Sequence, residues 1–151
     1  MHRPSLDYFP STVLDVPRPG EDPIDTLQEA LAVVSLMLPR PARDETFVLV
    51  VDDRRRGIGV ARFCTSPDSM AHDVAGFVSS FPAASGAIVV TTRRGRAVCP
   101  GDDTVWEKLS TVLGGAGIAL LDWVVSGSGG FYCPRVLVDA RNPWPGFTRA
   151  D

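Results

Sequence analysis

Two short runs of apolar and β-branched residues most constrain what this chain can fold into. They cover Thr46 to Val51 and Ala87 to Thr92, and neither alternates with polar residues. Such uniform runs are typical of strands that are buried on both faces of a sheet. We therefore predict an α/β domain in which helices flank a mixed β-sheet.

Three segments have apolar residues at helical spacing. Each segment stops at proline or glycine, which end helices. They are Ile24 to Leu38, before Pro39; Met70 to Phe81, before Pro82; and Val105 to Leu113, before Gly114 and Gly115. We expect Asp102 or Asp103 to cap the third helix, because a carboxylate at this position accepts hydrogen bonds from free backbone N–H groups.

The remaining strands are expected in pairs. Ile58 to Cys64 follows the polar turn at 52–57, and the two strands at 46–51 and 58–64 form a predicted hairpin. Ile118 to Ser126 and Tyr132 to Ala140 flank a glycine-rich turn and form the last predicted pair. The segment from Arg93 to Gly101 is charged and contains glycines, so we predict a loop there.

The domain organisation follows from length and from the prolines. A chain of 151 residues suits one domain. Residues 1–23 contain five prolines and are predicted to form an extended arm, residues 24–140 the domain, and residues 141–151 a tail. Trp144 stands between two prolines, and we favour its packing onto the domain over a role as an interface anchor.

Composition limits the function classes. The net charge of −3 gives no general attraction to nucleic acid or to anionic membranes. Cys64, Cys99 and Cys133 are far apart and odd in number, which argues against a disulfide framework and favours a reducing compartment. No apolar stretch is long enough for a membrane span. We therefore expect a cytoplasmic protein that does not insert into membranes.

Two motifs resemble a known family. Residues 117–132 read GIALLDWVVSGSGGFY, similar to a strand and a "GDGGY"-like turn, and the hairpin around Val50 to Gly59 resembles an earlier pair of strands. Over about residues 43 to 140 the chain resembles the RadC branch of the JAMM/MPN (JAB) metalloprotease family. This resemblance implies a cytidine-deaminase-like architecture.

The resemblance also implies the positions of a zinc site. Active members hold zinc with a His-x-His strand end and an aspartate that follows a serine, while a glutamate activates the zinc-bound water. Thr91 and Arg93 stand at the histidine positions of this chain, and one register places Cys99 and Asp102 at the serine and the aspartate. An ungapped register would place Gly101 and Thr104 there. We therefore expect no zinc peptidase activity, no metal and no cofactor. The family's glutamate could correspond to Glu45, just before the first strand.

Neither register recovers a histidine. The chain has two, His2 in the arm and His72 in the second predicted helix. Cys99 with His72 or Asp102 in support would form a nucleophile and base if they met in space. The alternative is a small buried thiol at Cys99 and a helix cap at Asp102, and we favour both of these structural roles.

Two arginine clusters are candidate binding sites. Arg93, Arg94 and Arg96, with Thr91, would clamp a carboxylate or phosphate; alternatively they form a solvated loop. Arg54, Arg55 and Arg56 occupy the expected hairpin tip, where charges are usually solvated.

Three hypotheses follow from these patterns. The first is a noncatalytic JAMM-like module, used as a binding or scaffold unit for a protein partner, a homodimer or a small anionic ligand. The second is a metal-independent hydrolase that uses Cys99. The third, which the acidic net charge opposes, is a nucleic-acid-binding protein associated with DNA repair.

Overall fold

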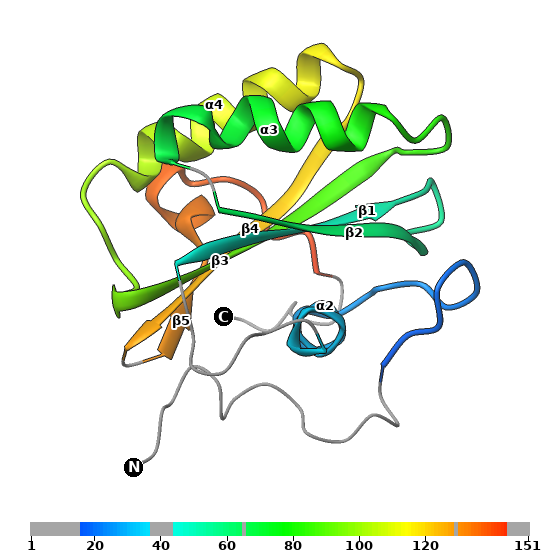
Figure 1. The fold of residues 1–151 in the computed structure, drawn as a ribbon, viewed down its shortest axis with the longest axis horizontal. Coiled ribbons are helices and arrows are strands. Elements are labelled where there is room, and N and C mark those ends of the chain that lie inside the picture. The colour runs from blue at the N-terminus through cyan, green and yellow to red at the C-terminus, as the bar shows by residue number, and fades with distance from the viewer. Residues whose placement is uncertain (1–15, 37–43, 65, 129, 145–151) are drawn as a thin grey trace.

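A computed structural model describes residues 16–36, 44–64, 66–128 and 130–144 of the chain (Figure 1). The expectations for His2, for residues 1–15 of the arm and for the end of the first predicted helix before Pro39 fall outside these ranges. Within them, the chain forms a five-stranded mixed sheet with helices on both of its faces. The predicted α/β class is confirmed.

The sheet has the strand order β2-β1-β3-β4-β5. β3 and β4 are parallel neighbours, and the other neighbouring pairs are antiparallel. The helix α4 connects the two parallel strands, as such a crossover requires. The bounds are β1 Glu45–Val51, β2 Gly57–Phe63, β3 Gly86–Arg96, β4 Ala119–Ser128 and β5 Gly130–Tyr132.

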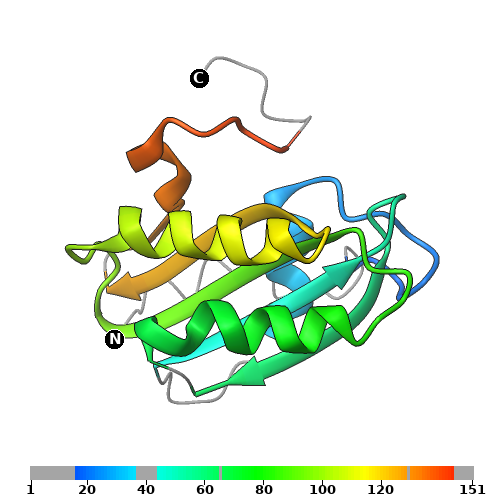
Figure 2. The same cartoon turned by 90° about the horizontal axis from the view of Figure 1, so that it is seen from above.

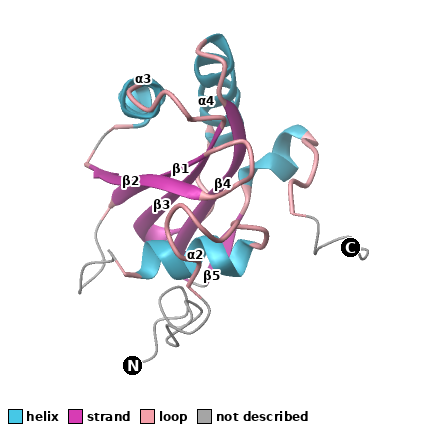
Figure 3. Ribbon diagram, turned by 90° about the vertical axis from the view of Figure 1, so that its right-hand side faces the viewer, coloured by secondary structure: helices cyan, strands magenta, loops and turns pink. Residues whose placement is uncertain are grey.

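The helices form two layers around this sheet. α3 (Pro67–Ser79) and α4 (Asp102–Gly115) cover one face, and α2 (Leu27–Ser35) covers the other (Figures 1 and 2). Seen from the side in Figure 3, α2 lies across the sheet from α3 and α4. Every residue of β1 is buried, because alternate side chains enter the two layers: Val48 packs in the α3 and α4 core, Phe47 in the α2 core.

Local sequence explains where α2 and α3 begin. Thr26 and Glu29 form a reciprocal capping box at α2, so this helix begins three residues after the predicted Ile24. Ser66 caps α3, and Pro67 occupies its first turn.

The predicted cap of α4 is wrong. Gly101 is the N-cap, with a φ of 90° that favours glycine, and neither Asp102 nor Asp103 caps the helix. The carboxylate of Asp102 instead binds other groups, described below.

The predicted loop from Arg93 to Gly101 is also wrong in its first half. β3 continues through Arg96, where it pairs with Ser128 of β4 after an irregularity that follows Thr92. Backbone pairing with a neighbouring strand does not depend on side-chain hydrophobicity, so the charged sequence concealed it. The loop between β3 and α4 is only residues 97–101, and we call it the β3–α4 loop.

The last predicted strand, Tyr132 to Ala140, is wrong beyond its first residue. β5 ends at Tyr132, and Pro134–Val138 forms the short 3-10 helix η2. Pro134 has no N–H for a strand ladder and suits the first turn of a helix. Asp139 is the C-cap of this short helix and has a φ of 59°.

Segments from the two ends of the described chain pack beside the β1–β2 hairpin. Arg55 Nε donates to the Ile24 carbonyl at 3.2 Å, and Arg55 Nη1 donates to the Pro143 carbonyl at 3.2 Å. Its guanidinium also lies 5.2 Å from the centre of the Trp144 ring. Trp144 is 2% exposed, so the predicted packing of this side chain onto the domain is confirmed. Across the described ranges, no helix has the length and apolarity needed to cross a membrane.

Candidate functional site

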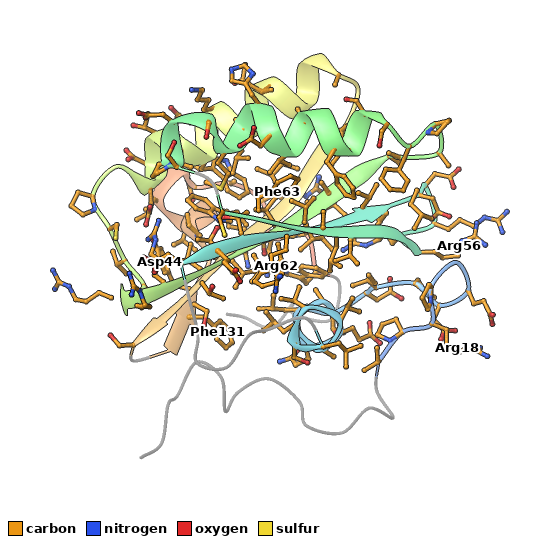
Figure 4. All side chains as sticks on the ribbon, in the orientation of Figure 1. Arg18, Asp44, Arg56, Arg62, Phe63 and Phe131 are labelled. Atoms are coloured by element: carbon orange, nitrogen blue, oxygen red, sulfur yellow. The ribbon has the colours of Figure 1, made fainter. Side chains whose placement is uncertain are left out.

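The candidate site lies at the end of the sheet where the parallel strands β3 and β4 finish. Ligands of α/β folds commonly bind outside the carboxyl ends of parallel strands, because loops and helix starts converge there. Here the β3–α4 loop, the start of α4 and β5 meet at this end. Figure 4 labels Asp44 and Phe131 toward this end, whereas Arg18 and Arg56 lie at the opposite end.

A bidentate ion pair between Arg93 and Asp102 is the centre of the site. Arg93 Nη2 lies 2.8 Å from Asp102 Oδ1, and Arg93 Nη1 lies 3.1 Å from Asp102 Oδ2. The two side chains are 18% and 2% exposed. Arg93 Nη1 also donates to the Ala97 carbonyl at 2.5 Å, so the same guanidinium fixes the start of the β3–α4 loop.

Asp102 has two further partners. The Tyr132 hydroxyl and the Cys99 backbone N–H, the latter at 3.0 Å, both donate to Asp102 Oδ2. Burial raises the pKa of Asp102, but hydrogen bonds from Arg93, Tyr132 and Cys99 outweigh burial and hold this pKa below its ordinary value. Burial and the Asp102 carboxylate raise the pKa of Tyr132. At neutral pH the site is therefore a carboxylate, a guanidinium and a neutral phenol.

The Thr91 hydroxyl also has its hydrogen-bond partners within the protein. Thr91 Oγ1 accepts a hydrogen bond of 2.9 Å from Trp123 Nε1 and lies 3.1 Å from Thr46 Oγ1. Thr91 is buried, and the Arg93 guanidinium lies 6.0 Å from the centre of the Trp123 ring. Thr91 therefore stabilises the core behind the site.

Two cavities flank the β3–α4 loop. Cavity A, of 420 Å³, lies between the start of β1, the end of β3 and the start of α3. Its lining includes Asp44, Thr46, Met70, Arg93, Arg96 and Cys99. Cavity B, of 770 Å³, lies between the loop, the start of α4 and β5; its lining includes Arg96, Val98, Pro100, Asp103, Tyr132 and Leu137.

The three predicted binding arginines have different roles. Arg93 is held by Asp102. Arg94 is exposed and meets Asp44: its backbone N–H donates to Asp44 Oδ1 at 2.7 Å, and its Nη2 lies 3.6 Å from Oδ2. Arg96 is exposed, forms no ion pair with a described residue and lines both cavities. The guanidinium that is available to a ligand is therefore that of Arg96.

The predicted nucleophile and base are not brought together. Cys99 is partly buried and lines both cavities, but His72 is exposed on α3 and lines neither of them. Asp102 contacts the backbone N–H of Cys99, and its Oδ2 has Arg93 and Tyr132 as its other partners. Sequence reasoning missed Tyr132, which lies 30 residues from Asp102 along the chain.

Glu45 lines cavity A but forms no hydrogen bond or ion pair with Arg93 or Asp102 in the described part of the chain. The register pairs Glu45 with Thr92, so both side chains lie on the face opposite Thr91 and Arg93. Its Oε2 lies 3.8 Å from Arg62 Nε and accepts from Cys64 Sγ at 3.7 Å. Within the described ranges, no group of three or more His, Cys, Asp or Glu side chains is placed to hold a metal ion.

The hairpin arginines do not form a basic patch. Arg55 binds backbone carbonyls of Ile24 and Pro143, and Arg56 pairs with Asp52 at 2.9 Å. Of the three, Arg54 is exposed, whereas Arg55 and Arg56 are half-buried.

Comparison with known proteins adds no family to this picture. No family model matches the chain, and no curated protein matches it. The geometry of the site is therefore the basis for the function proposed below.

Proposed function

We propose that this protein is a noncatalytic, JAMM-like module that binds another protein through the β3–α4 loop. The observation that carries the proposal is the bidentate ion pair between Arg93 and Asp102. This pair neutralises the centre of the site, and two cavities are open beside it.

The proposal that the module is noncatalytic rests on Thr91, Arg93 and Asp102. The resemblance places metal ligands at these three positions. The Thr91 hydroxyl accepts a hydrogen bond from Trp123, and the Arg93 guanidinium forms an ion pair with the Asp102 carboxylate. The positive charge of Arg93 would repel a divalent cation placed beside it. A cation that took the Asp102 carboxylate would leave the Arg93 guanidinium buried without its partner.

The binding part rests on the surface around cavity B. Val98 and Leu137 line this cavity and are 57% and 51% exposed. Exposed aliphatic residues beside a hollow are a feature of protein interaction sites. Nucleic acid is a poorer fit, because Arg55 and Arg56 are already engaged within the chain.

A small anionic ligand is the second candidate. It is favoured by one observation, the exposed Arg96 at the lining of the 420 Å³ cavity A. A guanidinium without a carboxylate partner binds carboxylate or phosphate well. A thiol hydrolase is less well supported, because His72 lines neither of the two cavities that Cys99 lines. The three free cysteines favour a cytoplasmic location.

Peptide selection tests the proposal directly. The full chain is panned against a display library of random linear peptides, and selected peptides are titrated by fluorescence anisotropy. We expect Leu137→Glu to remove binding and Cys99→Ser to preserve it. The matched control is Leu36→Glu, because Leu36 is also exposed but follows α2 on the other side of the sheet. Peptides that bind Leu137→Glu with the same affinity as the native chain would show that cavity B is not the binding site.

Calorimetry tests the remaining parts. Zinc chloride titrated into the chain should give no stoichiometric binding. Stoichiometric binding of zinc would overturn the proposal that the module is noncatalytic. Citrate and inorganic phosphate test the small-ligand candidate. Binding of either anion that Arg96→Ala removes would favour that candidate over a protein partner.

A further inference from the structure

We infer that the protein partner of cavity B is a second copy of this chain, bound about a two-fold axis so that Arg96 of each copy meets Asp103 of the other. The inference rests on the proposed binding function and names its partner. It is carried by two opposite charges that line the same cavity and form no ion pair with any described residue.

The two charges lie on either side of the β3–α4 loop. Arg96 ends β3 and Asp103 stands in the first turn of α4, and both are exposed. Neither forms an ion pair with a described residue, although both line cavity B. Asp102, which also lines cavity B, is already paired with Arg93 inside the chain. Arg96 and Asp103 therefore remain for an external partner.

A second copy satisfies both charges at once. An acidic peptide would pair with Arg96 but repel Asp103, and a basic peptide would do the reverse. In a two-fold dimer the same patch faces itself, so each contact of Arg96 with Asp103 is made twice. Opposite charges that face each other across an interface also fix its register.

Apolar side chains supply the area for such a contact. Val98, Val136 and Leu137 are three of the five large hydrophobic residues exposed in the described chain, at 57%, 63% and 51%. Val98 and Leu137 line cavity B, and Val136 precedes Leu137 in η2. A contact centred on the loop would cover all three, with the charges at its rim, which is the usual anatomy of an interface.

Charge reversal on the full chain tests the inference, with sedimentation velocity as the measurement. We expect the native chain to dimerise. Arg96→Asp and Asp103→Arg should each weaken the dimer by about tenfold or more, because each reversal creates two like-charge contacts. An equimolar mixture of the two variants should form a heterodimer, since every contact between them is again attractive. The two sites are exposed, so the folds should persist, which circular dichroism checks.

Two matched reversals serve as controls. Glu107→Arg lies one turn further along α4, and Arg54→Asp lies at the hairpin tip; both residues are exposed and neither lines cavity B. We expect both variants to dimerise like the native chain. Two variants that stay apart in the mixture would overturn the inference, and so would a dimer that neither reversal weakens.

The failure of this inference differs from the failure of the proposed function. A native chain that stays monomeric up to about 1 mM, the weak end of the affinity scale, overturns self-association. If that monomer still binds selected peptides through Leu137, the proposed binding function stands with another partner. If it binds none, both proposals fail.

Discussion

Trp144 Nε1 donates a hydrogen bond of 2.7 Å to Asp122 Oδ2, which joins the C-terminal segment to the centre of β4. Asp122 is fully buried and also accepts from Arg135 Nε at 3.2 Å and from the Trp123 backbone N–H at 2.9 Å. A buried carboxylate of this kind is tolerated because each donor replaces water. The last segment of the described chain is therefore part of the core.

Trp144→Ala should destabilise the protein by about 3–5 kcal/mol, because it removes a large buried side chain and one donor to Asp122. Trp144→Phe keeps most of the packing and loses the indole N–H, so we expect a smaller cost of about 1–3 kcal/mol. Urea unfolding followed by far-UV circular dichroism measures both. A cost near zero for Trp144→Phe would show that the hydrogen bond to Asp122 contributes nothing.

The Arg93–Asp102 pair should show strong energetic coupling. Arg93→Met or Asp102→Leu alone leaves the other charge buried, and we expect each to cost about 3–5 kcal/mol. The double variant removes both charges and should cost much less than the sum. A double-mutant cycle from urea unfolding measures the coupling. Additive costs would mean that the pair is not a unit.

Acid should remove the contribution of Asp102 to stability. Its folded pKa lies below the ordinary aspartate value of 3.8, so the folded state releases this proton more readily than the unfolded state does. The stabilisation is therefore fully present above 3.8 and is lost as the pH falls through the lower folded pKa. The unfolding free energies of the native chain and Asp102→Asn should converge from about pH 5 down to about pH 1. Parallel curves would contradict this prediction.

Gly127 fixes the distance between β4 and the β3–α4 loop. A Cβ at Gly127 would lie 2.5 Å from the Ala97 backbone N and 2.7 Å from the Gly95 carbonyl oxygen. Gly127→Ala should therefore cost about 1–3 kcal/mol and displace the loop that separates the two cavities. Gly76→Ala is the control: nothing lies within 4 Å of its Cβ, and alanine should stabilise the α3 interior by about 1 kcal/mol. Thermal unfolding should shift in opposite directions for the two variants.

The cysteines should differ in reactivity. Burial, together with the neighbouring Asp122 carboxylate, raises the pKa of the Cys133 thiol to about 12, whereas Cys64 is exposed. Iodoacetamide at about pH 8 should therefore label Cys64 first and leave Cys133 unlabelled until the chain unfolds, because the thiolate is the reactive form. Peptide mapping by mass spectrometry measures the order. Early labelling of Cys133 would contradict its predicted protection.

Sequence by itself determined the elements with strong local signals. The uniform run of β1 is buried on both faces, and α3 and α4 follow the spacing of their apolar residues. These signals depend on a residue and its near neighbours, so periodicity detects them. For Trp144 the sequence left packing onto the domain and an interface anchor as alternatives, and the favoured packing is confirmed. The JAMM-like architecture and the loss of catalysis stay predictions.

Tertiary structure decided the rest. The extension of β3 to Arg96 depends on a partner strand, and the end of β5 depends on how Pro134 turns the chain. The role of Asp102 was hidden because its partners Arg93 and Tyr132 come from different strands, and only folding brings them to one carboxylate. Sequence named Arg93 and Asp102 separately as candidates. The fold paired them, because a buried charge is stable only beside its opposite.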